Sequence, residues 1–182
     1  MTRKNRKRLV IDANIAYSAG TSEVPSSFYS RVCLDVILRD EHIAVFNRVL
    51  RQEWKNHASV HARRWQVAME QRRRIEDAEG DEFKDLLDRA CARLEGATWE
   101  NALRKDFHLV QSALATDRIL LSNESRLPSH LKASCETVPE LRKLFFANPQ
   151  REQDVCIRWI KAGARRETHR RIDQWSRHHT TN

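Results

Sequence analysis

Residues 8–20 read RLVIDANIAYSAG, and this stretch decides the fold that we predict. Leu9 to Ile11 is a short apolar run of the kind that becomes a buried strand. The run ends at Asp12, which places a carboxylate at the carboxyl end of a predicted central strand, where open α/β sheets bind their ligands. Asp is also a favoured helix N-cap. From this stretch alone, a helix cap is the simpler interpretation of Asp12. Whether Asp12 also belongs to a binding site depends on which other residues the fold brings near it.

The composition indicates one helix-rich domain. The chain has 182 residues, of which 40% are hydrophobic, and it contains only 4 Gly and 4 Pro, which argues against an all-β chain with many tight turns. Its 4 cysteines are widely spaced and form no CxxC pair, so we expect reduced thiols in a cytoplasmic protein. No stretch resembles a membrane span or a signal peptide, so no membrane partner is expected.

The chain is basic, with a formal net charge of +8, which favours a polyanionic partner such as nucleic acid. Two segments carry much of this charge, an N-terminal arm over residues 1–8 and a C-terminal extension over residues 148–182. They can neutralise phosphates, or they are a frayed terminus and a solvated helix face. The candidate nucleic-acid-binding residues are Arg3, Lys4, Arg6, Lys7, Arg8, Arg165, Arg166, Arg170 and Arg171.

The apolar pattern predicts alternating strands and helices, which is typical of a parallel sheet with right-handed crossovers. Asn148-Pro149 is the best linker signal, and it divides a domain over residues 1–147 from a basic helical extension over residues 148–182. Strands are expected at residues 9–11, 42–47, 119–121 and 135–138, and helices at residues 26–38, 48–78, 81–94, 99–116 and 139–145.

Four acidic residues stand next to predicted strand ends or in the flanking helices, namely Asp12, Glu53, Asp106 and Glu124. A doubly wound sheet brings such positions to one edge. Clustered carboxylates repel one another unless a cation neutralises them, and hard oxygen ligands suit Mg²⁺ or Mn²⁺. Such ions, in pairs, catalyse phosphodiester hydrolysis. The sequence therefore predicts a site for one or two ions, and it lacks a convincing Ser/His/Asp set.

Five motifs, in order along the chain, resemble those of PIN-domain nucleases. The resemblance covers residues 8 to 147. No motif is specific by itself, and the specificity comes from their order and spacing. The motifs are VIDAN at residues 10–14, LRQEW at 50–54, DFHLVQSALA at 106–115, ILLSNE at 119–124 and VPEL at 138–141.

The resemblance implies a three-layer α/β/α fold around a parallel sheet of four or five short strands. It also implies metal-dependent endonucleolysis of RNA by in-line attack of water, which leaves a 5′-phosphate and a 3′-hydroxyl. Asp12, Glu53 and Asp106 would hold the metal, and Glu124 occupies a position where the family usually has Asp. Because Glu is longer, the neighbouring Asn123 is an alternative counterpart.

The resemblance further assigns supporting roles to Asn14 and Ser122, which would orient a ligand or a water. Small bacterial members of the family are often the toxins of toxin–antitoxin pairs, commonly homodimers inhibited by a partner that covers the acids. Two other functions stay open, a non-catalytic PIN-like RNA-binding scaffold and a structure-specific DNA nuclease of related fold. Among the tryptophans, Trp159 and Trp175 are the candidates for stacking on RNA bases.

Histidines near the predicted acids offer a competing site. Glu53, His57 and His61 follow one another at intervals of four residues, a spacing that can hold a transition metal. We favour an exposed polar helix face instead, because no further ligand is evident. His108 is expected to be a packed or surface residue that points away from Asp106.

Overall fold

A parallel sheet of five strands forms the centre of the computed structural model, which describes residues 6–92 and 97–176. The strand order is β3-β2-β1-β4-β5, and each neighbouring pair is parallel. The chain therefore builds outward from β1 in one direction and then crosses back to build in the other. The strands are β1 (Arg8–Ile11), β2 (Ile43–Phe46), β3 (Ile75–Asp77), β4 (Ile119–Leu121) and β5 (Phe145–Ala147).

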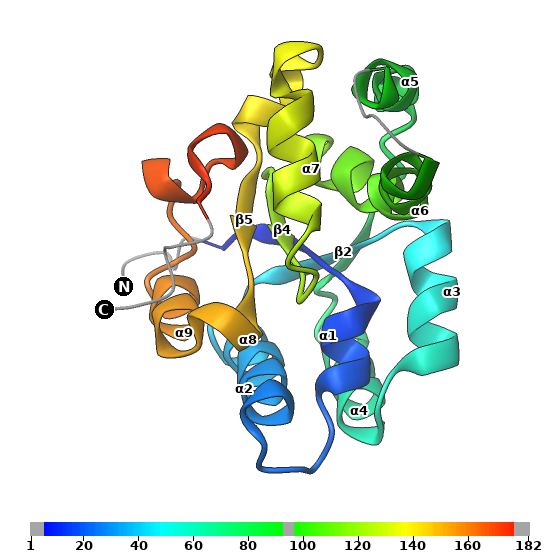
Figure 1. The fold of residues 1–182 in the computed structure, drawn as a ribbon. Helices are drawn as coiled ribbons and strands as arrows, with labels where there is room; N and C mark the ends of the chain where they lie inside the picture. The colour runs from blue at the N-terminus through cyan, green and yellow to red at the C-terminus, as the bar shows by residue number, and fades with distance from the viewer. Residues whose placement is uncertain (1–5, 93–96, 177–182) are drawn as a thin grey trace.

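Helices cover both faces of this sheet, which confirms the predicted three-layer α/β/α architecture (Figure 1). α3 (Arg48–His57) stands near the carboxyl ends of the strands and contacts both α1 and α6. None of the helices formed by the described residues is both long and apolar enough to cross a membrane. One layer contains α1 (Ala13–Ser18), α2 (Pro25–Arg39), α4 (Val60–Gln71), α8 (Pro149–Glu152) and α9 (Asp154–Lys161), and the other contains α5 (Leu86–Cys91), α6 (Ala97–Leu114) and α7 (Leu127–Ala133).

The three inner strands are uninterrupted apolar runs because helices bury them from both sides. Every residue of β4 is buried, as are the last three residues of β1 and of β2. Leu9 is aligned with Ala44 of β2 and with Ile119 of β4, so β1 lies at the centre of the core. The prediction of strands at residues 9–11 and 119–121 is confirmed.

The predicted strand at residues 135–138 is wrong. These residues form a 3₁₀ helix, η2 (Ser134–Glu136), and a turn that leads into a second one, η3 (Pro139–Lys143). The fourth predicted strand is replaced by β5, whose first residue, Phe145, was expected to be the last residue of a helix. A strand covered on both faces needs a continuous apolar run, and the LFFA of residues 144–147 supplies one.

The predicted helix over residues 48–78 is two helices followed by β3. Ser59 separates α3 from α4, because its hydroxyl accepts a backbone N–H from the first turn of α4 at 3.2 Å. Arg73 then adopts φ 53 and turns the chain into β3. The last two residues of β3 are Glu76 and Asp77, so this edge strand lacks the apolar alternation that predicts a strand.

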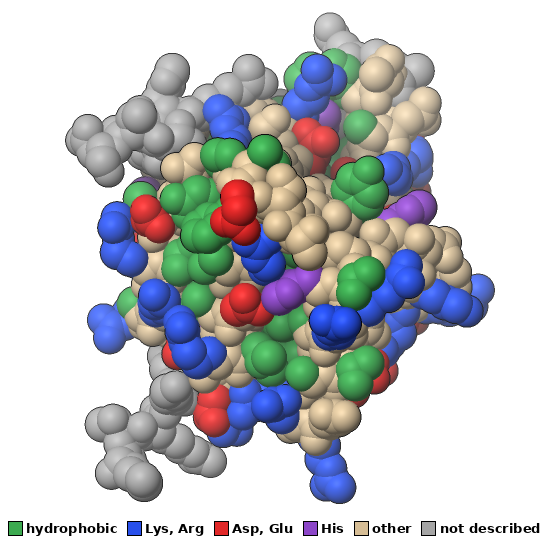
Figure 2. All heavy atoms as spheres, turned by 90° about the horizontal axis from the view of Figure 1, so that it is seen from below, with side chains coloured by type: hydrophobic (Ala, Val, Ile, Leu, Met, Phe, Trp, Pro, Cys, Tyr) green, Lys and Arg blue, Asp and Glu red, His purple; other side chains and the backbone are tan. Residues whose placement is uncertain are grey.

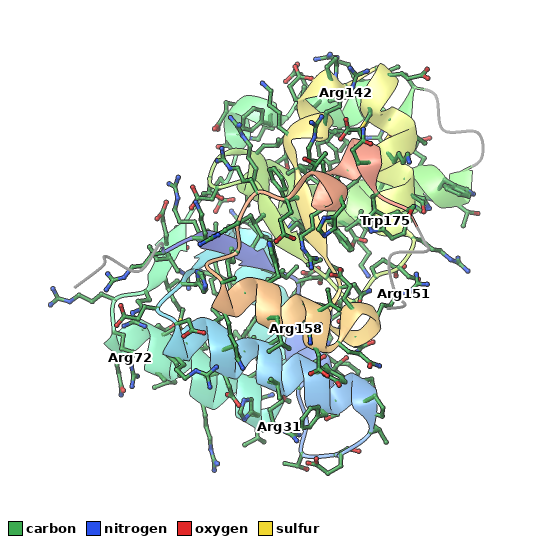
Figure 3. All side chains as sticks on the ribbon, turned by 90° about the vertical axis from the view of Figure 1, so that its left-hand side faces the viewer. Arg31, Arg72, Arg142, Arg151, Arg158 and Trp175 are labelled. Atoms are coloured by element: carbon green, nitrogen blue, oxygen red, sulfur yellow. The ribbon has the colours of Figure 1, made fainter. Side chains whose placement is uncertain are left out.

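The C-terminal segment packs onto the rest of the fold. Asn148, at the predicted linker, is the N-cap of α8 and accepts the Arg151 N–H at 3.0 Å. α9 lies along α2, as Figures 1 and 3 show. Beyond α9, the Ile172 N–H donates to the Leu144 carbonyl at 3.0 Å, beside the first residue of β5. Residues 149–176 therefore extend the helical layer and contact an edge of the sheet.

Arg170 is an internal residue of this segment. It is 3% exposed, and its guanidinium forms ion pairs with Glu152 and Glu167. The same guanidinium lies over the ring of Trp159, 4.4 Å from its centroid. Trp159 is also buried, and its indole N–H donates to the Arg165 carbonyl at 2.8 Å. Both residues were candidate RNA contacts, and the structure places them inside the packing of this segment.

We expect Arg170→Ala to lower the free energy of unfolding by about 3 kcal/mol, because it removes a buried cation and leaves the half-buried Glu152 carboxylate without it. Arg166→Ala, at an exposed position in the same segment, should change it by less than about 0.5 kcal/mol. Urea unfolding followed by circular dichroism measures both. Equal stabilities of the two variants would contradict the internal role of Arg170.

Candidate functional site

The strand order reverses between β1 and β4, and the predicted site lies at the carboxyl ends of these two strands. Asp12 follows β1, and Ser122 follows β4. The Asp12 N–H donates to the Leu121 carbonyl at 2.9 Å, which extends the ladder by one residue and brings Asp12 beside Ser122. In open parallel sheets, ligands bind at this kind of topological switch point.

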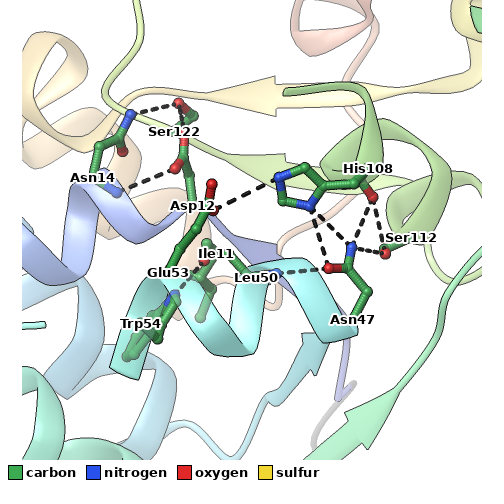
Figure 4. A network of polar contacts seen from close by, with 10 residues as sticks. All are labelled: Ile11, Asp12, Asn14, Asn47, Leu50, Glu53, Trp54, His108, Ser112 and Ser122. Atoms are coloured by element: carbon green, nitrogen blue, oxygen red, sulfur yellow. Dashed lines mark hydrogen bonds and ion pairs between the residues drawn. The ribbon is translucent and has the colours of Figure 1, made fainter. Parts of the chain in front are cut away.

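A network of hydrogen bonds fixes the Asp12 carboxylate (Figure 4). One oxygen accepts the Ser122 hydroxyl at 2.6 Å, and the other accepts the Asn14 N–H at 3.1 Å. The side-chain amide of Asn14 donates in turn to the Ser122 oxygen at 3.1 Å. Asp12 is therefore the N-cap of α1 and is held from the opposite side by the loop after β4.

The four predicted acids line one cleft of about 380 Å³. Asp12 comes from the end of β1, Glu53 from α3, Asp106 from α6, and Glu124 from the loop after β4. The fold thus brings together four segments that are far apart in the sequence. The remaining residues that line this cleft are Ala13, Asn14, Tyr17, His57 and Lys105.

Glu124, and not its neighbour Asn123, faces this cleft. The side-chain amide of Asn123 donates to the Ser30 hydroxyl of α2 at 3.1 Å, on the other side of the loop. One carboxylate oxygen of Glu124 accepts the Arg126 N–H at 2.8 Å. Of these two neighbours, Glu124 is therefore the one that lines the cleft with the other three predicted acids.

The acids raise one another's pKa. Burial, the largest cause, and the charges of Asp12, Glu124 and Glu53 raise the pKa of Asp106 to about 6. Burial and the charge of Asp12 also raise the pKa of Glu53. Lys105 is exposed at the cleft, and its charge lowers the pKa of these carboxyls in part. Burial and repulsion between the carboxylates both disfavour their charged forms, and a nearby positive charge counteracts both effects.

His108 is packed, as expected, but it also faces an acid of the cleft. Its Nε2 lies 3.7 Å from a carboxylate oxygen of Glu53. The side-chain amide of Asn47, the N-cap of α3, donates to the His108 carbonyl at 2.9 Å and to the Ser112 hydroxyl at 2.7 Å. Burial lowers the pKa of His108 to about 4, so the ring is neutral at pH 7. Asn47 directly follows β2, and a polar residue at a strand end could have been identified from the sequence as part of the site.

The competing histidine site does not form. α3 ends at His57, and His61 belongs to α4. The ring of His61 lies 2.9 Å from the Asp35 carboxylate of α2. His57 and His61 therefore do not share a helix face, and the expectation of one exposed polar helix face that carries both is wrong.

The donors in the acidic cleft fit Mg²⁺ or Mn²⁺ by their chemistry. They are carboxylates with amide and hydroxyl oxygens close by, the hard ligands that these ions prefer. Within residues 6–92 and 97–176, no three Asp, Glu, His or Cys side chains are arranged so that they could hold an ion as they stand. Mg²⁺ keeps several of its waters and commonly takes only one or two carboxylates. Asp12 and Asp106, the most deeply placed acids, are the first candidates to hold it.

The basic N-terminal arm leaves the sheet at the end opposite the cleft, because Arg8 begins β1 and Asp12 follows its end. Arg8 donates to the Asp117 carboxylate through its N–H at 2.8 Å and its guanidinium at 3.2 Å, so Asp117 is also remote from the cleft. Arg6 forms an ion pair with Glu41 at 2.7 Å. Lys7 is half-buried. Two further residues of the arm, Arg3 and Lys4, lie outside the described residues.

The basic residues of the C-terminal segment also lie away from the acids. Arg171 bridges to Phe145, the first residue of β5, and is ion-paired with Asp173 at 2.7 Å. Arg165 and Arg166 are exposed. Figure 2 shows Lys and Arg side chains around the rim of the face seen from below and also near its middle, beside acidic side chains. None of the described residues of the two predicted segments lines the cleft.

Two cations that do lie at the acids were not predicted. Lys105 lines the acidic cleft, and Arg126 lines an adjoining one. Each is close in sequence to a motif acid, since Lys105 precedes Asp106 and Arg126 follows Glu124 by two residues. This proximity was the signal that could have identified them.

Comparisons of the chain with protein-family models, with curated proteins and with solved structures find no match. The resemblance to PIN-domain nucleases is thus carried by the five motifs alone.

We expect Asp106→Asn to stabilise the metal-free protein at pH 8 by about 1–2 kcal/mol, after allowance for solvent screening of a partly exposed side chain. The pKa of Asp106 is about 6 in the folded chain, above its ordinary value of 3.8. Its charge therefore destabilises the folded state above pH 6, and this effect disappears below pH 3.8.

Urea unfolding in the presence of a chelator, at pH 8 and at pH 4, measures this difference between Asp106→Asn and the parent. Asp88→Asn, an exposed acid on α5, is the matched control and should show little change at either pH. A gain for Asp106→Asn that is the same at both pH values would contradict the electrostatic origin.

Proposed function

We propose that this protein is a Mg²⁺- or Mn²⁺-dependent nuclease of the PIN-domain type that hydrolyses phosphodiester bonds in RNA. The observation that best supports this is the convergence of Asp12, Glu53, Asp106 and Glu124 on one cleft at the switch point of the sheet. Each acid comes from a different motif of the resemblance. RNA as the substrate follows from that resemblance.

The residues that would hold the ion are Asp12 and Asp106, with Glu53 and Glu124 at the sides of the cleft. When bound, Mg²⁺ or Mn²⁺ supplies positive charge that favours ionisation of the attacking water and stabilises the departing oxygen. The protein contributes rigid placement. Each oxygen of Asp12 accepts one hydrogen bond within the protein, and a carboxylate has about four lone-pair sites, so capacity remains for a cation.

Glu53 is positioned through its neighbours. The indole N–H of Trp54 donates to the Ile11 carbonyl at 3.1 Å, which ties α3 to β1 one residue before Asp12. On the other side of Glu53, the neutral ring of His108 lies within 3.7 Å of its carboxylate. The hydrogen bond of Trp54 holds this turn of α3 against β1, and the His108 ring lies beside the Glu53 carboxylate at the cleft (Figure 4).

Lys105 gives the acidic cleft a means of binding a polyanion. Four carboxylates repel a phosphodiester, and the bound ion offsets only part of that repulsion. An exposed ammonium at the same cleft attracts phosphate in a salt-dependent way. Lys105 is therefore the residue to which we assign substrate phosphate binding at the acids.

We expect the purified protein with Mn²⁺ to cleave labelled RNA into products with 5′-phosphates and 3′-hydroxyls. Asp12→Asn should reduce the rate by more than about 100-fold, since even residues that merely support metal ligands are worth 10–100-fold. Asn caps a helix as well as Asp does, so the variant should fold. Asp88→Asn is the matched control and should cleave at the parent's rate.

Single-stranded DNA and flap DNA, tested in parallel with RNA, separate the alternatives. Cleavage of flap DNA alone would replace the proposal with the structure-specific DNA nuclease. Binding of RNA without cleavage, at any Mn²⁺ or Mg²⁺ concentration, would replace it with the non-catalytic scaffold. Equal cleavage by Asp12→Asn and the parent would assign the activity to a contaminant.

We expect Ser122→Ala to move the acidic limb of the pH–rate profile upward by about one pH unit or more. Burial raises the pKa of Asp12, and the hydrogen bond from Ser122 lowers it. A hydrogen bond to a charged group contributes about 1.5–3 kcal/mol, which corresponds to about one to two pH units. The measurement is kcat/KM from pH 5 to pH 9. A profile that is lower but has an unchanged midpoint would contradict this role.

A further inference from the structure

A second cleft, of about 230 Å³, adjoins the acidic one. The two clefts share Asp106 and Glu124, so the second opens directly beside the acids. It lies between the first turns of α6 and the start of α7. Its other lining residues are Thr98, Trp99, Ala102, Arg126, Leu127 and His130.

Trp99 provides an accessible aromatic surface in this cleft. The residue is 44% exposed, although a tryptophan of a folded domain is usually buried for most of its surface. Its ring packs against the buried ring of His130, with the centroids 4.1 Å apart and the planes inclined at 45°. His130 therefore supports the indole from one side while much of its surface remains accessible.

The other four tryptophans, all within the described residues, do not offer such a surface. Trp54, Trp65 and Trp159 are buried. Trp175 is half-buried, with its ring edge-on to Phe146 at 6.4 Å. The sequence-based candidates for base stacking, Trp159 and Trp175, are thus less suited to it than Trp99.

We propose that the second cleft binds a nucleobase of the RNA, stacked on Trp99, one nucleotide or less from the phosphate at the acids. This inference rests on the proposed function. Aromatic side chains bind bases of single strands by stacking, which tolerates any base because each has a π face. Since a base and its phosphate are joined through one sugar, the two subsites must adjoin, and the shared Asp106 and Glu124 meet that condition.

Arg126 adds the charge that such a subsite needs. It is exposed and lines the second cleft, and its backbone N–H is hydrogen-bonded to Glu124 at 2.8 Å. A guanidinium can pair with a phosphate or lie over a base plane. With Lys105 on the acidic cleft, the two cations lie at the two clefts that the strand would occupy.

Fluorescence of 2-aminopurine, which falls when this base stacks, tests the subsite directly. Short single-stranded RNAs carrying 2-aminopurine at successive positions are titrated into the Asp12→Asn protein, which binds without cutting. We expect quenching at one position. Adding Trp99→Ala should abolish that quenching and weaken binding about 5- to 100-fold, whereas Trp99→Phe should keep most of both. Phe28→Ala, a partly exposed aromatic outside both clefts, is the matched control and should change neither.

An abasic nucleotide provides a second readout in the active protein. Removing the base at the quenched position should slow cleavage by the parent about 5- to 100-fold and leave cleavage by Trp99→Ala unchanged. Equal quenching with and without Trp99, or an abasic effect that persists in Trp99→Ala, would overturn the inference while leaving the nuclease proposal intact. Quenching that depends on Trp99 in a protein that cuts no RNA would overturn the nuclease proposal and leave the base cleft standing.

Discussion

The backbone pairing of β1 with β4 is the interaction on which the rest of the site depends. Ile11 is aligned with Leu121, and the Asp12 N–H continues the ladder to the Leu121 carbonyl at 2.9 Å. A slip of one residue in either strand would turn every side chain to the opposite face. The same register places Ser122 against Asp12 and leaves the Ile11 carbonyl to receive the indole of Trp54. The loop after β4 and the helix α3 are thus both positioned from one pair of strands.

The acidic cleft is unfavourable for folding and favourable for cation binding, and both properties have the same cause. Burial and mutual repulsion raise the pKa of Asp12, Glu53 and Asp106. The core around β1, buried on both faces, offsets this destabilisation. A cation that bound only the folded chain would recover this free energy through linkage. The proposed ion would therefore gain part of its affinity from relief of this repulsion.

Much of the central fold could be predicted because the inner strands are apolar runs that end in polar residues. The convergence of the acids followed, since parallel strands end at one edge. The edge strand β3 and the later strand β5 were missed, the first because its residues are mostly charged and the second because its apolar run could also continue a helix. Trp99, His108 and Lys105 were missed because the rotation of α6 decides what they face, and the sequence pattern does not determine it. Which end of the sheet the basic segments reach could not be predicted either, since charge patterning carries no information about it.

Asp12 fills a structural position and a chemical one with the same carboxylate, since it caps α1 and lies in the acidic cleft. Asn can replace it as a cap, and the Asn side-chain carbonyl can still accept the Ser122 hydroxyl. The codons of Asp and Asn differ by a single nucleotide. A gene for this fold can therefore lose its central charge in one mutational step while the scaffold, freed of some repulsion, persists. Descendants that keep the architecture and the clefts but no chemistry are an evolutionary outcome that this geometry makes accessible.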